Sequence, residues 1–131
     1  MNDRFKFRVW LEYAKLYYGL DSFYYDRLKN KYTLHFEDGH TKTIKEKDCV
    51  IEQCTGLKDK NGKLIYEGDI LGYKDYADKR VVVWDNKYMA YRVHDEDNVD
   101  CGSVYQEYIG EFGIEVIGNI HENPELLKES K

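Results

Sequence analysis

The chain has 131 residues, a formal net charge of −5, and a composition of 34% charged and 42% hydrophobic residues. This balance is typical of one globular domain or two very small ones and excludes a largely disordered chain. The acidic charge argues against a non-specific nucleic-acid-binding protein, since such proteins usually carry a basic face. No apolar run approaches the roughly 20 residues that span a bilayer, and no signal-peptide core follows the N-terminus, so we expect a cytoplasmic protein. Thirteen tyrosines favour a β-rich fold, because tyrosine suits half-buried sheet faces.

The first predicted strand is Arg4 to Trp10, where polar and apolar residues alternate. The alternation places Arg4, Lys6 and Arg8 on one face of this strand. We expect that basic face to be solvated, as is usual for the outer face of an antiparallel sheet.

Two aromatic runs follow, and their short spacing predicts strand segments over Leu16 to Tyr18 and over Phe23 to Tyr25. The expected turns are residues 19–21 and Asp26 to Asn30. An amphipathic helix over Glu12 to Tyr18 is the alternative for the first run.

A hairpin is predicted where Asp38-Gly39 separates the alternating segments Tyr32 to Glu37 and His40 to Lys45. A two-residue loop of this kind requires both of its residues to adopt positive φ. Cys49 to Cys54 is a further candidate strand.

The segment Thr55 to Asp69 contains two turns, at Asn61-Gly62 and at Glu67 to Asp69, and leads into a strand over Ile70 to Lys74. Its glycines and Asn61 are explained by turn geometry. We expect its charged residues to lie mostly in solvent.

A meander of closely spaced strands is predicted next, which is the pattern of a small barrel. The expected strands are Arg80 to Trp84, Tyr88 to His94, Val104 to Ile109 and Ile114 to Ile120. The chain then changes character, because Asn123 followed by Pro124 is typical of a helix start. The sequence therefore predicts a mostly β protein with minor α structure.

The segment Thr-Gly-Leu-Lys-Asp-Lys-Asn-Gly-Lys-Leu-Ile-Tyr-Glu-Gly-Asp-Ile, residues 55–70, resembles the signature of the YopX-like family of phage and prophage proteins. Phe5 to Trp10 resembles the opening strand of that family, and Val116 to Leu127 resembles its ending. These matches bracket nearly the whole chain, and Glu12 to Lys47 matches least.

The resemblance implies an SH3-like barrel over residues 54–122. From the residue patterns we expect an N-terminal β-rich region over residues 1–53 before it and a short C-terminal helix or tail over residues 123–131 after it. It also implies a phage or prophage origin and a location in the cytoplasm of a bacterial host with a Gram-positive wall. It implies no activity, so no active-site residues carry over.

Metal binding is not predicted from the cysteines. Cys49, Cys54 and Cys101 form no CxxC pair, and a reducing compartment makes free thiols the default. A four-ligand set with one of the histidines His35, His40, His94 or His121 would have to be assembled by the fold. We expect no cofactor.

The acidic loop between His94 and Asp100 invites comparison with a calcium-binding EF-hand loop. Asp95 and Asp97 fit its positions 1 and 3, but Asp100 stands where the turn requires glycine and Gln106 where glutamate is required. A solvated loop is the preferred interpretation.

Catalytic motifs are also missing from the sequence. Ser22, Ser103 and Ser130 lie in no nucleophile-elbow motif, and there is no P-loop or dinucleotide-binding glycine pattern. Glu67 and Asp69 could form a carboxylate pair, but turn formation explains them more simply. The chain is therefore predicted to be non-enzymatic.

Binding is the remaining function class. The candidate binding surface consists of the aromatic residues Tyr73, Tyr76, Trp84, Tyr88 and Tyr91. Such residues could form a groove for a peptide, for single-stranded nucleic acid or for a subunit partner.

The first hypothesis for the function is an accessory protein that binds another protein or its own copies. The alternative is a nucleic-acid-associated module, which would need a local basic patch formed by Lys74, Lys79, Arg80 and Lys87. An enzyme of unrecognised type would need a concave pocket with convergent polar groups.

Overall fold

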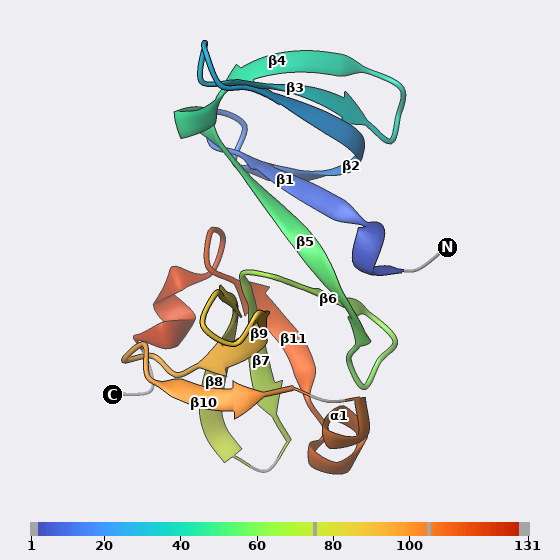
Figure 1. Cartoon of the computed structure of the whole chain (residues 1–131). Helices are drawn as coiled ribbons and strands as arrows, with labels where there is room; N and C mark the ends of the chain where they lie inside the picture. The colour runs from blue at the N-terminus through green and yellow to red at the C-terminus, as the bar shows by residue number, and fades with distance from the viewer. Residues whose placement is uncertain (1–2, 75, 105, 129–131) are drawn as a thin grey trace. The chain divides into compact units, whose positions relative to one another are not determined.

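The computed structural model describes residues 3–74, 76–104 and 106–128. The chain forms two compact units, Met1–Cys54 and Thr55–Lys131, and strand β5 (Cys49–Lys58) runs through the boundary between them. Figure 1 shows that strands make up most of both units, which confirms the mostly β fold with minor α structure.

The first unit is an antiparallel sheet with the strand order β4-β3-β2-β1-β5. Its elements in chain order are the 3-10 helix η1 (Asp3–Phe5), strands β1 (Phe7–Leu11), β2 (Leu16–Asp26), β3 (Lys31–Phe36) and β4 (Thr41–Lys45), the 3-10 helix η2 (Glu46–Asp48) and the first part of β5. One apolar cluster holds it together, formed by Val9, Leu11, Leu20, Leu34, Phe36, Ile44 and Cys49.

Two expectations for the start of the chain are wrong. The first strand begins at Phe7, because residues 3–5 form the 3-10 helix η1. Arg8 is not solvated: it lies opposite Glu52 in the register and forms an ion pair with this buried carboxylate. Arg4 and Lys6 are exposed, as expected.

The two aromatic runs belong to one strand, β2, so neither the predicted turn at residues 19–21 nor the alternative helix forms. Gly19 lies inside this strand, with the Glu37 carboxylate next to its Cα. The chain reverses instead before β2, where Lys15 adopts a φ of 54°.

The hairpin at Asp38-Gly39 is confirmed as β3 and β4, but its loop is longer than two residues. The strands end at Phe36 and resume at Thr41, and only Gly39 has positive φ. Asp38 instead accepts a hydrogen bond from the backbone N–H of His40 at 2.9 Å, which is a common turn contact for aspartate.

The second unit combines a hairpin with an antiparallel sheet of order β10-β9-β8-β7-β11. Its elements are the end of β5, strands β6 (Leu64–Tyr66), β7 (Asp69–Tyr73), β8 (Tyr76–Asp85), β9 (Ala90–His94) and β10 (Asp100–Ser103), helix α1 (Gln106–Phe112), strand β11 (Glu115–Asn119) and the 3-10 helix η3 (Pro124–Leu127). Its core is formed by Ile65, Leu71, Val82, Val93, Ile109 and Ile114. No sheet among the described residues closes on itself, so the SH3-like barrel is not confirmed.

The predicted strand over Val104 to Ile109 is wrong, because residues 106–112 form helix α1. Ile109 packs into the core from this helix, and the rings of Tyr108 and Phe112, one turn apart, contact each other at a tilt of 54° with their centres 4.7 Å apart. The predicted C-terminal helix is shorter than expected, since Pro124–Leu127 is a single 3-10 turn. Asn123 makes no side-chain cap; its Oδ1 accepts the backbone N–H of Asn119 at 3.2 Å.

The segment from Thr55 to Asp69 forms both predicted turns, and Gly62 and Gly68 have positive φ. The expectation that its charged residues lie in solvent fails for Asp59 and Asp69, which are 5% and 1% exposed. Both carboxylates accept backbone N–H groups within the segment, and the Asp69 carboxylate receives that of Tyr66 at 2.8 Å. These contacts supply the hydrogen bonds that a buried carboxylate needs.

A matched pair of glycines tests the packing around α1. Gly113→Ala is expected to lower the free energy of unfolding of the second unit by about 1–3 kcal/mol. Gly113 has a φ of +58°, and an added Cβ would lie 2.8 Å from Cβ of Lys74. Gly110→Ala is the control, because Gly110 lies on α1 with nothing within 4 Å of its would-be Cβ.

Alanine at position 110 should raise stability by about 0.5–1 kcal/mol, because alanine is the better helix former. Urea denaturation followed by Trp84 fluorescence measures both variants. A Gly113→Ala protein as stable as the wild type would contradict the close approach to Lys74.

Candidate functional site

The candidate site is a pocket of about 230 Å³ in the second unit. Strands β7, β8, β9 and β10, helix α1 and Ile114, just before β11, contribute to its walls. Its apolar and aromatic lining consists of Tyr73, Val93, Val104, Tyr108, Phe112 and Ile114. Its polar lining consists of Asp78, Arg80, Cys101 and Ser103.

Two of the three aromatic side chains of the pocket pack against the hydrophobic core. Tyr73 and Phe112 both pack against the buried cluster of the second unit, whereas Tyr108 is 43% exposed. Burial raises the pKa of the Tyr73 hydroxyl, and the nearby charge of Arg80 opposes that shift only in part. The hydroxyl is therefore protonated at neutral pH and can donate a hydrogen bond.

Arg80 is a cation in the wall of this pocket, and its guanidinium has N–H donors that can form further hydrogen bonds. Its guanidinium donates to Oδ2 of Asp78 and to the backbone carbonyl of Lys79, both at 3.4 Å. Its central carbon lies 5.7 Å from the ring centre of Tyr73. Because both hydrogen bonds are long and a guanidinium has five N–H donors, Arg80 can also bind an acidic group that enters the pocket.

The described side chains of the predicted aromatic surface lie in three different places. Tyr73 lies in the pocket, whereas Trp84 and Tyr91 form a separate cross-strand pair with ring centres 5.0 Å apart. Tyr88 lies in the turn between β8 and β9, with the guanidinium of Arg92 3.9 Å from its ring centre. The side chain of Tyr76 lies outside the described residues.

Tyr108 and Phe112 are not among the predicted site residues, because the sequence pattern predicts a strand over residues 104–109. The signal was present in the spacing, since Tyr108 and Phe112 are four residues apart and share one face of a helix. Val104 and Ile114 flank that helix, and their part in the pocket follows only from the fold.

The cysteines differ sharply in accessibility. Cys49 and Cys54 are buried and Cys101 is exposed, and all three are free thiols. Burial, followed by the charges of Asp48 and Glu46, raises the pKa of Cys49. Cys101 is therefore the thiol that a modifying reagent can reach, and it lies in the wall of the pocket.

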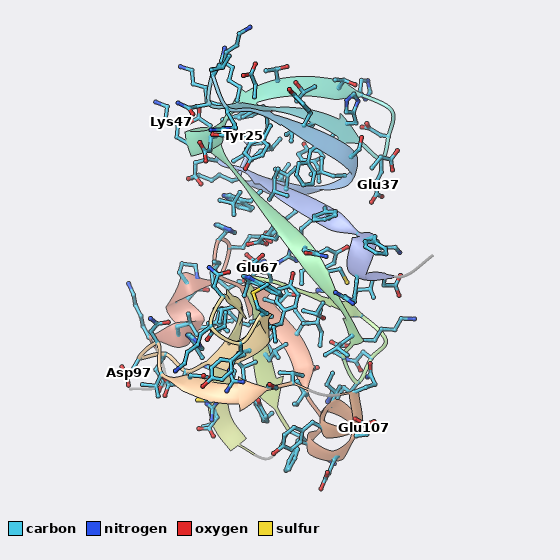
Figure 2. All side chains as sticks on the ribbon, viewed as in Figure 1. Tyr25, Glu37, Lys47, Glu67, Asp97 and Glu107 are labelled. Atoms are coloured by element: carbon cyan, nitrogen blue, oxygen red, sulfur yellow. The ribbon has the colours of Figure 1, made fainter. Side chains whose placement is uncertain are left out.

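A possible metal-binding group lies outside this pocket. Asp85, His94 and Asp100 each offer one ligand atom, and these atoms lie within 4.8 Å of one another. Within the described ranges of the chain, no cysteine joins such a group. The acidic loop residue Asp97 is not part of it and lies exposed at the loop tip (Figure 2).

The described chain is thus a mostly antiparallel β protein of two units, with a small aromatic pocket in the second. It belongs to the YopX family, because the family model described as YopX protein matches residues 6–128. A similar solved structure is the crystal structure of protein EF1440 from Enterococcus faecalis, with 32% sequence identity and a TM-score of 0.70, covering 93% of this chain and 96% of that one. The chain matches no curated protein. In the part of the chain that the structure describes, no helix combines the length and apolar character needed to cross a membrane.

Proposed function

We propose that this protein is a non-enzymatic binding module whose second unit receives one apolar side chain of a partner protein. The pocket carries the proposal, because its walls are aromatic and its polar groups lie at the same opening. Interfaces concentrate their binding energy in such anchored, desolvated side chains. The family resemblance suggests that the partner is present in the cytoplasm of a bacterium that carries the phage or prophage.

The size of the pocket favours a side chain over a cofactor. Small-molecule sites usually measure about 300–1,000 Å³, whereas a cavity of about 150 Å³ holds one benzene ring. The volume of about 230 Å³ therefore suits a single aromatic or branched apolar group. Arg80 favours an acidic residue next to that group in the partner.

The polar groups of the pocket do not favour catalysis. The Ser103 hydroxyl accepts a hydrogen bond from the guanidinium of Arg92 at 3.3 Å. An arginine side chain has no acceptor and cannot take the proton from a serine nucleophile. Arg80 forms an ion pair with Asp78, and we assign these charged groups to recognition of a polar group of the partner.

A second copy of the chain is one form that the partner can take. Trp84, Tyr88 and Met89 are 40%, 49% and 71% exposed, and they lie at the turn end of β8 and β9. Light scattering on the purified protein distinguishes self-association from binding of another protein. A clean monomer at high concentration would exclude the self-associating form.

The nucleic-acid alternative would use Lys74, Lys79 and Lys87 with the exposed aromatic residues. The net charge of −5 and the pairing of the nearby Arg92 with Asp100 weaken this alternative. A gel-shift titration at low salt with single- and double-stranded DNA and RNA tests it, and a salt-dependent shift would favour it.

Selective modification of Cys101 tests the proposed site. Peptides are first selected from a displayed random library against the unmodified protein, and their affinity is measured by fluorescence polarisation. We expect the selected peptides to share an aromatic or branched apolar residue. Alkylating Cys101 with N-phenylmaleimide, which places a ring in the pocket, should weaken binding at least about tenfold.

The control is the Cys101→Ser variant treated with the same reagent, which should bind the peptide as before. Tyr108→Ala is a second test, because it removes a half-exposed wall of the pocket without touching the core. Equal affinity before and after alkylation, or a selection without any enriched apolar residue, would contradict the proposal.

A further inference from the structure

We propose that Asp85, His94 and Asp100 form a binding site for a divalent transition-metal ion, of which Zn²⁺ is the representative. Asp100 begins β10 directly opposite His94 of β9, and Asp85 ends the neighbouring strand β8, so residues up to 15 positions apart in the chain contribute to the site. The ligand atoms of the three side chains lie within 4.8 Å of one another. This site is separate from the pocket and does not depend on the proposed binding function.

His94 supplies the decisive observation. Its Nδ1 lies 2.9 Å from Oδ1 of Asn98, and an amide oxygen only accepts hydrogen bonds. Nδ1 therefore carries the proton in the neutral ring, and the lone pair is on Nε2. That nitrogen is buried and has no hydrogen-bond partner among the described residues.

An unpartnered buried acceptor costs about 1–3 kcal/mol, so native structures rarely leave one without a function. A ring nitrogen whose opposite N–H is held by an oxygen acceptor is the usual arrangement of a metal-binding histidine. Because Nδ1 is held by Asn98, Nε2 is the ring nitrogen that remains available as a ligand atom.

The two carboxylates are positioned by backbone contacts. Oδ1 of Asp85 accepts the N–H of Lys87 at 2.8 Å, and Oδ1 of Asp100 accepts the N–H of Gly102 at 2.9 Å. Each carboxylate offers about four lone-pair directions, so both keep acceptor capacity for an ion. Such supporting contacts orient ligands and raise metal affinity.

The donor set selects the class of ion. One imidazole nitrogen and two carboxylate oxygens suit Zn²⁺, whereas Ca²⁺ and Mg²⁺ prefer sites made of oxygen alone. Three protein ligands would leave further positions on the ion for water. The ligand atoms must draw together on binding, because bonds of about 2.0–2.2 Å place neighbouring ligands closer than 4.8 Å.

Arg92 competes with a bound ion for the carboxylate of Asp100. Its Nε donates to both oxygens of Asp100, at 3.1 and 2.9 Å. A bound cation would share Asp100 with this guanidinium, and their charges repel. We therefore expect Arg92→Gln to strengthen zinc binding.

Isothermal titration of the metal-free full chain with ZnCl₂ tests the site. We expect one bound ion, with His94→Gln and Asp85→Asn each weakening binding at least about tenfold. The matched controls are His40→Gln, an exposed histidine of the first unit, and Cys101→Ser, the thiol next to Asp100. Both controls should bind zinc like the wild type.

A second measurement uses only the wild-type protein, so its result does not depend on whether the variants fold. In ¹⁵N-edited NMR spectra of the imidazole rings, zinc should shift Nε2 of His94 and leave Nδ1 protonated. Absence of zinc binding at millimolar concentration, unchanged affinity in His94→Gln, or loss of binding in Cys101→Ser would each overturn the proposal.

Discussion

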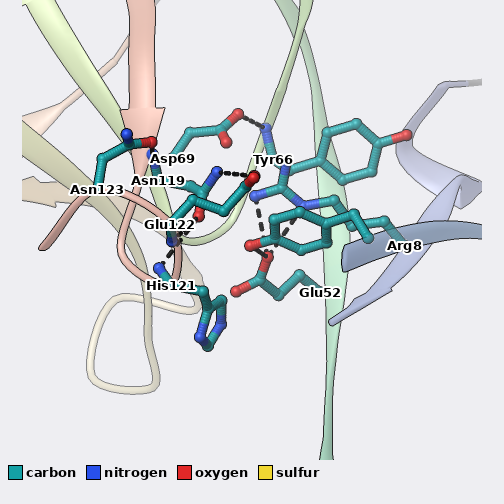
Figure 3. A network of polar contacts seen from close by, with 9 residues as sticks. Arg8, Glu52, Tyr66, Asp69, Asn119, His121, Glu122 and Asn123 are labelled. Carbon is teal, nitrogen blue, oxygen red and sulfur yellow. Dashed lines mark hydrogen bonds and ion pairs between the residues drawn. The ribbon is translucent and has the colours of Figure 1, made fainter. Parts of the chain in front are cut away.

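Replacing Arg8 by Met is expected to lower the free energy of unfolding of the first unit by about 3–5 kcal/mol. Arg8 contacts Oε1 of Glu52 through both Nε and Nη2, each at 2.9 Å, and the Glu52 side chain is only 3% exposed (Figure 3). The Tyr17 hydroxyl donates to the same oxygen at 2.8 Å, and its ring centre lies 4.1 Å from the guanidinium carbon. Removing the cation leaves the buried carboxylate without the charge of Arg8. Loss of one partner of a buried ion pair is strongly destabilising.

Urea denaturation measures this effect, and the two tryptophans allow the units to be followed separately. Trp10 lies in the first unit and Trp84 in the second, so a Trp84→Phe background reports only the first. The double variant Arg8→Met with Glu52→Met should recover most of the lost stability, because no charge remains buried. Arg27→Met, at an exposed arginine, is the control. A double variant as unstable as Arg8→Met alone would show that the ion pair is not the cause.

The Asp59→Ala variant is expected to lose about 2–4 kcal/mol of stability in the second unit. Oδ1 of Asp59 accepts the backbone N–H groups of Asn61 and Lys63 at 2.8 and 2.9 Å, and Oδ2 accepts that of Val116 at 3.0 Å. One carboxylate thus ties the turn after β5 to strand β11. Alanine would leave these donors without their acceptor in a buried environment.

The same carboxylate predicts how this contribution depends on pH. Burial of Asp59 raises its pKa, but the three backbone N–H groups outweigh burial, and the folded-state pKa lies below the ordinary value. The stabilisation is therefore fully present above the unfolded pKa of about 3.9 and is lost as the pH falls through the folded-state pKa. The stability gap between wild type and Asp59→Asn should be large at pH 7 and shrink in acid.

Urea denaturation at a series of pH values, followed by Trp84 fluorescence, measures this gap. Glu111→Gln, at an exposed position on α1, is the control and should show a small gap at every pH. A gap between wild type and Asp59→Asn that stays constant from pH 7 to about pH 3 would contradict the assigned role.

The sequence predicted those elements whose local pattern and tertiary environment agree. The β3–β4 hairpin and the turn at Asn61-Gly62 follow from glycines with positive φ between alternating segments. Gly19 indicates a turn by residue type, but it lies inside strand β2 and does not have positive φ. A glycine inside a strand and a glycine in a turn cannot be distinguished by residue type alone.

The pocket was less predictable than the fold. The sequence predicts Tyr73 and Arg80 as candidate residues, but in the pocket they lie with Tyr108 and Phe112, which belong to helix α1 where the pattern predicts a strand. The burial of Asp59 could not be predicted from the local sequence either. Its partner Val116 is 57 positions away, so a charged residue expected in solvent is buried by a contact that only the fold creates.

The most direct test of the central claim is NMR mapping of a selected peptide on the ¹⁵N-labelled protein. If the second unit receives a side chain of the partner, the largest amide shifts should lie around the pocket, at Gly72, Tyr73, Arg80, Cys101 and Phe112. Shifts confined to the first unit or to the turn around Tyr88, with the pocket amides unchanged, would contradict the claim.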